Sequence, residues 1–412
     1  MVKAAALIRS HNRVFSDGFF GDASLDFQTR TALGKTAHGG SDAGEVLATI
    51  ARVHGHRDWF TEWSATARRT QAVAEQARRK GHRVSARSAF LRAATYWACA
   101  MDAAPEAGLR DTFARHRACW DAFIEGSEGA HISLEVPYDG DVMPGYLLRP
   151  DDSGAARPTL VVTNGSDGSI SDLWSGGCVA GALERGWNAF VYDGPGQQSM
   201  LFERGIPFRP DWEAVLTPVL DVVLARPDVD SERTAGYGIS QAGYWLTRAL
   251  VSEHRLRAAV VDPGVVDVST SWTSNLSKGM VQRLEDGDRD GFMKNMRVAE
   301  HIPALRRTLA FRGRPYAHDD WFDLFTAVRQ YRVTPEDAAK IRTPLLITDP
   351  EDEQFWPGQP RRLAGLVPGA EVVAFSAAEG ASGHCEPMAR LLVEQRVFDW
   401  LDGRLAGTGG AV

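Results

Sequence analysis

A serine between small residues constrains this chain of 412 residues more than any other feature. The segment Tyr-Gly-Ile-Ser-Gln-Ala-Gly at residues 237–243 ends a short apolar stretch, and apolar side chains then recur at helical spacing over residues 244–251. Gly238 and Ala242 lie two residues either side of Ser240, where bulk would collide with the adjoining strand or helix. The pattern predicts a serine nucleophile on a sharp strand-to-helix turn. The alternative is a glycine-rich turn with only a structural role.

Strand and helix patterns alternate around this turn. Residues 131–148 alternate in polarity on either side of a Tyr-Asp-Gly-Asp turn, which predicts a β-hairpin. Further apolar strands are expected at 159–163, 188–192, 258–261 and 344–348, with helices between them. Such alternation is typical of a mostly parallel, doubly wound sheet with helices on both faces. The predicted fold class is therefore α/β.

The chain divides near residue 130, because residues 41–128 have helical patterns and no convincing strand. We predict a helical N-terminal cap region at 1–129 and a catalytic domain at 130–405. Roughly eighty residues separate the last two of the expected strands named above, which is too many for an ordinary crossover. We expect the segment 268–340 to be a helical excursion over the sheet edge, where it could roof a site.

An acid and a histidine follow the serine in the order that this type of turn uses. A serine hydroxyl needs a base to take its proton, and the base needs an acid to orient it. We predict that the base is His384, which follows the last expected strand. For the acid we choose Asp352, on the turn after the strand at 344–348, and Asp349 and Glu351 remain open as alternatives.

Acyl transfer also needs two backbone N–H groups to bind the oxyanion. We expect one from Gln241, directly after the serine, and the other from Ser166 in the small-residue loop 164–169, with Gly165 as the alternative. The Asp-Gly-Pro-Gly-Gln segment at 193–197 follows the next strand at the same sheet edge. It is predicted to be a rigid turn that shapes the pocket floor, and no chemistry is assigned to it.

Charge and cysteine content argue against several other functions. The net charge of −7 and the pI of about 5.9 disfavour a nucleic-acid partner. The four cysteines lack zinc or disulfide spacing and indicate reduced cytosolic thiols, and no signal peptide or membrane span is expected. Residues 286–291 open like a calcium-binding loop, but Arg297 stands where the last ligand should be a glutamate. We therefore predict no metal and no membrane partner.

Several of these motifs together resemble the FrsA-like α/β-hydrolases, over most of residues 45–400. The resemblance rests on the serine turn, on Gly-His-Arg-Val-Ser-Ala-Arg at 81–87, on Tyr-Asp-Gly-Pro-Gly-Gln at 192–197 and on Gly-His-Cys at 383–385. That group includes 2,6-dihydroxypseudooxynicotine hydrolase and the fungal yellowish-green pigment hydrolases. The resemblance implies an α/β-hydrolase core with a helical N-terminal cap, a homodimer and no cofactor. Its Ser-Asp-His triad falls on Ser240, Asp352 and His384.

The expected function is hydrolysis of a small or medium metabolite by a cytoplasmic serine enzyme. The resemblance implies cleavage of an ester, or of a C–C bond beside a ketone, in a substrate that resembles a polyketide of secondary metabolism. Elimination or acyl-transfer cyclisation on the same fold is one alternative. A non-catalytic binding module is another, and the ordered serine, acid and histidine argue against it. A peptidase is disfavoured because the predicted cap is helical and no propeller pattern appears.

Overall fold

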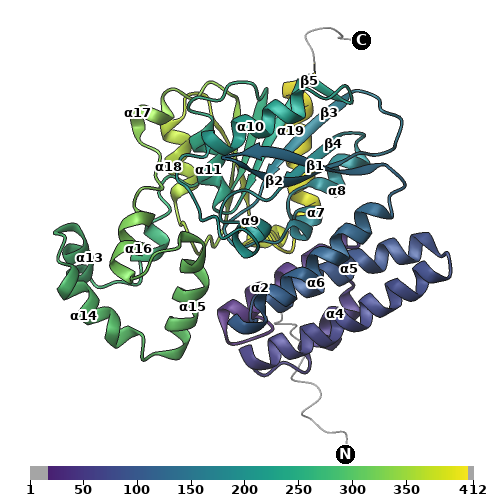
Figure 1. Cartoon of the computed structure of the whole chain (residues 1–412). Helices are drawn as coiled ribbons and strands as arrows, with labels where there is room; N and C mark the ends of the chain where they lie inside the picture. The colour runs from purple at the N-terminus through teal and green to yellow at the C-terminus, as the bar shows by residue number, and fades with distance from the viewer. Residues whose placement is uncertain (1–16, 407–412) are drawn as a thin grey trace, which may run out of the picture.

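A sheet of eight strands lies at the centre of the computed structural model, which describes residues 17–406 (Figure 1). Its order is β1-β2-β4-β3-β5-β6-β7-β8, with β1–β2 and β2–β4 antiparallel and the other neighbours parallel. The strands are β1 His131–Tyr138, β2 Asp141–Leu148, β3 Arg157–Thr163, β4 Asn188–Tyr192, β5 Val229–Ile239, β6 Ala258–Asp262, β7 Leu345–Pro350 and β8 Glu371–Phe375. The predicted mostly parallel sheet is confirmed.

Local sequence explains the hairpin and the central strands. Asp139 and Gly140 connect β1 to β2 with φ values of 50° and 83°, and two such residues form the turn whose twist suits a two-residue hairpin. The residues of β4 and β6 are all buried, because helices cover both sides of a parallel sheet. Only Phe375 of the edge strand β8 is buried, so this strand needs fewer apolar residues.

Helices pack on both faces of the sheet. Side chains alternate across each strand, so Leu160 and Val162 of β3 join one apolar core and Val161 joins the other. The first core includes α8 (Val179–Glu184) and α19 (Arg390–Leu405), and the second includes α10 (Glu213–Leu224), α11 (Ala242–Ala249) and α18 (Gln359–Leu366). Shorter connecting segments are η3 Ile170–Asp172, α7 Leu173–Gly176, α9 Gln198–Phe202 and η5 Ala377–Glu379.

The N-terminal helices share the first of these cores. They are α2 Ala23–Gly34, η2 Lys35–His38, α3 Ala43–Ile50, α4 His56–Arg79, α5 Arg83–Met101 and α6 Glu106–Glu125. Trp63 and Trp97 of these helices belong to the same continuous apolar cluster as Phe398 of α19. The first strand begins at His131, one residue after the predicted start of the catalytic domain. Residues 1–16 of the predicted cap lie outside the described part of the chain.

A second group of helices separates β6 from β7. It consists of α12 Thr270–Thr273, α13 Lys278–Glu285, α14 Arg289–Ala299, α15 Pro303–Gly313, η4 Arg314–Tyr316, α16 Trp321–Val328 and α17 Pro335–Ala338. In Figure 1 the green helices α13–α16 and the purple and blue N-terminal helices lie below the sheet. Arg314 Nη2 contacts Glu106 Oε2 at 2.8 Å, so an ion pair joins the two groups.

Several features bear on the functions that composition disfavours. Asp288 accepts the Gly291 N–H at 2.9 Å and caps α14, so the calcium-like segment is an interhelical turn. Across residues 17–406, no three His, Cys, Asp or Glu side chains are grouped as metal ligands. The cysteines Cys99, Cys119, Cys178 and Cys385 are all buried and free. No helix in the described range combines the length and apolar content of a membrane span.

A buried ion pair ties η2 to α19. His38 Nε2 lies 2.8 Å from Glu394 Oε2, and the two side chains are 4% and 2% exposed. Burial alone would lower the pKa of His38, but the hydrogen bond and charge of Glu394 raise it above the ordinary value of 6.5. The stabilisation is therefore fully present below about pH 6.5 and is lost as the pH rises through the higher folded-state pKa.

Replacing His38 by glutamine is expected to destabilise the protein more in acid than in alkali. Loss of a buried pair costs about 3 kcal/mol, so the free energy of unfolding should fall by roughly that much near pH 6 and by clearly less near pH 9. Urea denaturation of both proteins at the two pH values measures the difference. The exposed His254, changed to glutamine, is the control. An equal loss at both pH values would show that the pair carries no charge.

Candidate active site

Ser240 lies on a strained turn between β5 and α11. Its φ is 59°, a left-handed conformation that non-glycine residues rarely adopt. The Ser240 N–H donates to the Asp262 carbonyl at 2.6 Å, which ties the turn to the end of β6. A Cβ on Gly238 would lie 2.6 Å from the Ala242 carbonyl oxygen, so the turn closes only around a glycine. The local sequence therefore holds the serine at the carboxyl edge of the sheet.

His384 lies within hydrogen-bonding distance of the serine. Its Nε2 is 2.8 Å from Ser240 Oγ, and its Nδ1 is 2.8 Å from Glu353 Oε2. The histidine is 4% exposed, so water does not separate these groups. In this arrangement the imidazole can take the serine proton while the carboxylate holds the ring in one orientation. The structure thus brings together the two predicted residues Ser240 and His384.

The carboxylate that contacts His384 is Glu353. The prediction that Asp352 makes this contact was wrong. Asp352 is exposed and has a φ of 61°, and this left-handed residue turns the chain so that the next side chain is buried. The two alternatives also lie elsewhere. Asp349 Oδ2 pairs with Arg361 Nε at 2.7 Å, and Glu351 Oε2 accepts the Ala377 N–H at 2.7 Å.

Three hydrogen bonds hold Glu353 in place as an ionised group. Besides the histidine contact, its Oε1 accepts the N–H groups of Phe355 and Trp356 at 2.8 and 3.1 Å. Burial raises the pKa of Glu353, but the charge of His384 and these hydrogen bonds outweigh it, so the pKa is lowered overall. One sequence signal pointed to this residue: Glu353 is the carboxylate nearest to the apolar Phe-Trp pair.

The predicted oxyanion loop lies against the serine. A Cβ on Gly165 would be 2.8 Å from the Ser240 Cβ, so only glycine lets the two segments approach this closely. The Gly165 N–H already donates to Asn164 Oδ1 at 2.8 Å, which leaves it unavailable to a substrate. For the N–H groups of Ser166 and Gln241, no acceptor is found among residues 17–406. Gln241 also precedes α11, where the helix dipole favours negative charge.

Gln197 positions this loop, a role that the sequence did not reveal. Its Nε2 donates to the carbonyls of Asn164 and Gly165 at 2.7 and 3.1 Å, and its Oε1 accepts the Gly194 N–H at 2.9 Å. In a trans peptide the C=O and N–H point in opposite directions. The bond to the Gly165 carbonyl therefore directs the Ser166 N–H away from Gln197. The turn at 193–197, to which no chemistry was assigned, therefore orients the N–H group of Ser166, the predicted oxyanion donor.

Aromatic side chains from three parts of the chain surround the site. The His384 ring has Phe355, Trp356 and Phe27 as neighbours, at centroid distances of 4.7, 5.5 and 6.2 Å. Phe27 comes from α2, so the N-terminal helices reach the catalytic histidine candidate. From the second helical group, the Tyr316 hydroxyl lies 3.4 Å from Gln241 Oε1. These rings make the immediate surroundings of His384 largely apolar.

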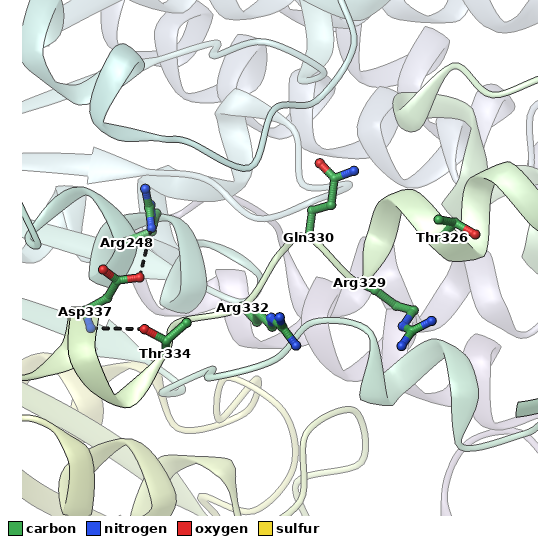
Figure 2. A pocket seen from close by; sticks show the side chains of 7 residues that line it. All are labelled: Arg248, Thr326, Arg329, Gln330, Arg332, Thr334 and Asp337. Carbon is green, nitrogen blue, oxygen red and sulfur yellow. Dashed lines mark hydrogen bonds and ion pairs between the residues drawn. The ribbon is translucent and has the colours of Figure 1, made fainter. Parts of the chain in front are cut away.

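A separate surface cavity of about 470 Å³ lies where α11, α16 and α17 meet (Figure 2). Figure 2 shows Arg248 paired with Asp337 at one end, at 3.2 Å, and Arg329 nearer the other end. The lining residues include neither Ser240 nor His384. Arg248 lies eight residues beyond Ser240, which corresponds to about 12 Å along a helix. The Ser240–His384 contact therefore lies apart from this cavity.

Changing Gly165 to alanine is expected to lower kcat/KM about 10²- to 10³-fold with little effect on KM. The added methyl group would push the loop away from the serine and misplace the Ser166 N–H, and one lost oxyanion donor costs about that factor. The assay is hydrolysis of an aryl ester. Gly279→Ala is the matched control, because a Cβ there meets nothing within 4 Å. A rate within threefold of the native value would exclude the loop from the oxyanion site.

Several known proteins are similar to this chain. No family model matches the chain. The 20-hydroxy-prefusarin hydrolase of Gibberella moniliformis is 29% identical over 428 residues, which cover 96% of this chain and 98% of that protein. The hydrolase acrC of Aspergillus aculeatus is 30% identical, over 65% of this chain and 69% of its own. The solved 2,6-dihydroxy-pseudo-oxynicotine hydrolase matches with a TM-score of 0.73 at 19% identity, covering 92% of this chain and 97% of its own.

Proposed function

This chain belongs to the α/β-hydrolases, as its motifs predicted, and on that premise we propose that it is a serine hydrolase with a Ser240-His384-Glu353 triad. The observation that carries the proposal is the unbroken pair of 2.8 Å contacts from Ser240 Oγ through the imidazole to Glu353. A buried carboxylate with a lowered pKa supports it, because that group can stabilise the imidazolium that forms when the serine proton moves.

The first half of the reaction forms an acyl-enzyme. Ser240 Oγ attacks the substrate carbonyl carbon and His384 Nε2 takes the hydroxyl proton. The carbonyl oxygen becomes an oxyanion between the Ser166 and Gln241 N–H groups. When the tetrahedral intermediate collapses, the leaving group departs with the bonding electron pair and receives the proton from His384. For an ester the leaving atom is oxygen, and for a β-diketone it is the carbon of an enolate that the second carbonyl stabilises.

Water completes the cycle. His384 removes a proton from a water molecule, and the resulting hydroxide attacks the acyl carbon on Ser240. Collapse of the second tetrahedral intermediate returns the proton to Ser240 Oγ and releases a carboxylic acid. Every proton passes through the imidazole, and Glu353 stays ionised throughout. The net reaction consumes one water for each ester or C–C bond cleaved.

The proposed substrate is an ester or a ketone-bearing compound of small or medium size from secondary metabolism. Support comes from the aromatic residues Phe27, Phe355 and Trp356 around the histidine and from the relative named for 20-hydroxy-prefusarin. We also propose that the helices before residue 130 act as a cap, because Phe27 lies against the His384 ring. The homodimer and the cytoplasmic location stay predictions.

A fluorophosphonate probe tests the nucleophile directly. The native protein is treated with the probe, digested, and mapped by mass spectrometry. We expect one adduct, on the peptide that contains Ser240, because among residues 17–406 only this serine contacts a histidine that is itself hydrogen-bonded to a carboxylate. No adduct on a natively folded protein, or an adduct only on other serines, would contradict the proposal. Circular dichroism confirms folding in each case.

Product analysis in ¹⁸O-labelled water then separates hydrolysis from the alternatives. Aryl esters and β-diketones are the first substrates to screen. Hydrolysis places one labelled oxygen in the carboxylate product, since water resolves the acyl-enzyme. Elimination yields an alkene and cyclisation yields a lactone, both without the label in the product bond. Turnover without label incorporation would therefore replace hydrolysis by one of these reactions.

A further inference from the structure

A fully buried carboxylate lies directly beneath the serine turn. Asp262, at the end of β6, accepts hydrogen bonds from the Tyr237 hydroxyl at 2.5 Å and the Thr348 hydroxyl at 2.9 Å. Arg390 Nη1 lies 3.1 Å from the same carboxylate, and its side chain is 3% exposed. Strands β5, β6 and β7 and helix α19 thus meet at one acidic group. None of these side chains takes part in the proposed reaction steps.

The backbone of Asp262 connects the two catalytic turns. Its carbonyl oxygen accepts the Ser240 N–H at 2.6 Å and the Cys385 thiol at 3.2 Å. Arg390 Nη1 also donates to the Cys385 carbonyl at 2.6 Å. Cys385 directly follows His384, so the turn that carries the proposed base and the turn that carries the proposed nucleophile are both hydrogen-bonded to the same carbonyl oxygen of β6.

The turn after the base needs such an anchor. Cys385 and Glu386 have φ values of 58° and 40°, so two successive non-glycine residues adopt left-handed conformations. Strained backbone of this kind persists only where surrounding contacts hold it. Contacts to other parts of the chain come from Asp262 and Arg390, and from the Gly383 N–H, which donates to the Glu351 carbonyl at 2.7 Å, and the Glu386 N–H donates to the Gly383 carbonyl at 3.0 Å within the turn.

Glu386 adds a second carboxyl group to this enclosed site. The residue is 0% exposed, and neither of its oxygens receives a hydrogen from an N–H or O–H donor in the described chain. Arg390 Nη1 lies 3.6 Å from Glu386 Oε2 and 3.1 Å from Asp262 Oδ2, so the two buried carboxyl groups share one guanidinium. Two ionised carboxylates offer only acceptors, so a hydrogen bond between them requires a proton. A single guanidinium also leaves one of two buried negative charges uncompensated.

The neighbouring charges decide which carboxyl holds the proton. Burial and the negative charge of Asp262 raise the pKa of Glu386 well above its ordinary value. For Asp262, burial is outweighed by Arg390 and by several hydrogen bonds, so its pKa is lowered. The other titratable groups acting on this pair are Glu353, which raises the pKa of Glu386 further, and the neutral Tyr237 and Cys385.

We propose that Glu386 is a neutral carboxylic acid that donates a hydrogen bond to Asp262, and that Glu386 and Arg390 are positioning residues that hold the His384 turn against the Ser240 turn. The inference rests on the proposed function, because its effect is measured as serine reactivity. Glu386 touches no reacting atom, and it acts through the backbone that carries the base.

Paired substitutions at Glu386 distinguish a neutral donor from an ionised group. Glutamine keeps the shape and a neutral donor, so Glu386→Gln should retain the second-order rate of fluorophosphonate labelling within about threefold. Leucine removes the hydrogen bond, and Glu386→Leu should lower that rate about 10²-fold through displacement of the base. Glu336→Gln, on the exposed side of α17, is the matched control. Thermal unfolding of each variant shows whether lost reactivity merely follows lost stability.

The pH profile supplies a readout that a structural role would not change. If Glu386 is neutral, Glu386→Gln removes no charge, and the midpoint of the labelling profile should stay at the native pH. If Glu386 is ionised, loss of a negative charge near the imidazole should shift the midpoint to lower pH. A shifted midpoint, or equal rates for the glutamine and leucine variants, would overturn the proposal.

Infrared spectroscopy tests the proton without any activity. The native protein should show the C=O stretch of a buried carboxylic acid, and this band should be missing from Glu386→Gln. A native protein that is not labelled but shows the band would refute the proposed function and leave the neutral Glu386 standing. A native protein that is labelled but lacks the band would refute the neutral Glu386 and leave the proposed function standing.

Discussion

Alanine at Ser240 or at His384 is expected to lower kcat about 10⁶-fold, because the nucleophile and its base act as one unit. Without Ser240 no acyl-enzyme can form, and without His384 nothing lies 2.8 Å from Ser240 Oγ to take its proton. The measurement is kcat on the best aryl ester or β-diketone found by screening, with fluorophosphonate labelling as a second readout. The folded state of each variant is checked by circular dichroism.

The double variant sharpens this expectation. If the two residues form a unit, alanine at both positions should cost no more than alanine at one. The exposed Ser252, changed to alanine, is the control for a serine substitution and should keep native activity. Losses that multiply in the double variant would mean that Ser240 and His384 contribute independently, and a triad would then be excluded.

Glutamine at Glu353 is expected to lower kcat about 10⁴-fold, whereas asparagine at Asp352 should leave it within threefold. The amide keeps the shape of Glu353 but lacks its charge, so the imidazole loses the partner that holds its tautomer and stabilises its protonated form. Asp352 is exposed and has no such contact. The two adjacent variants form a matched pair, and steady-state kinetics on one substrate compares them.

The pH dependence of these two variants follows from the lowered pKa of Glu353. Burial would raise that pKa, but the charge of His384 and the hydrogen bonds lower it below the ordinary value of 4.5. The carboxylate is therefore ionised at any pH above 4.5 and becomes protonated only at a lower pH. The defect of the glutamine variant should therefore persist across the whole neutral range. A larger defect in the asparagine variant at Asp352 would reverse the assignment of the acid.

Local sequence was enough to predict the sheet and to single out the proposed nucleophile and the proposed base. A strand, a tight turn and a helix need particular residues within a few positions of one another, and Gly238 and Ala242 met that need around Ser240. The serine, the carboxylate cluster and the histidine each follow a predicted strand, and the ends of parallel strands meet at one edge of the sheet. This is why the sequence could bring the three together. Apolar runs over the strands predicted the α/β class because both faces of such a sheet are covered.

Tertiary structure alone decided which carboxylate and which turn residues serve the site. Four acidic residues lie within residues 349–353, and the left-handed backbone at Asp352 selects Glu353 by turning its side chain toward a histidine that lies 31 positions further along the chain. Gln197 likewise holds Gly165 over a separation of 32 residues. The periodicity of a sequence reports only which residues share a face of one strand or helix, so contacts between distant segments leave no pattern in it. Among chemically equivalent carboxylates, burial and hydrogen bonding in the folded protein decide which one contacts the histidine.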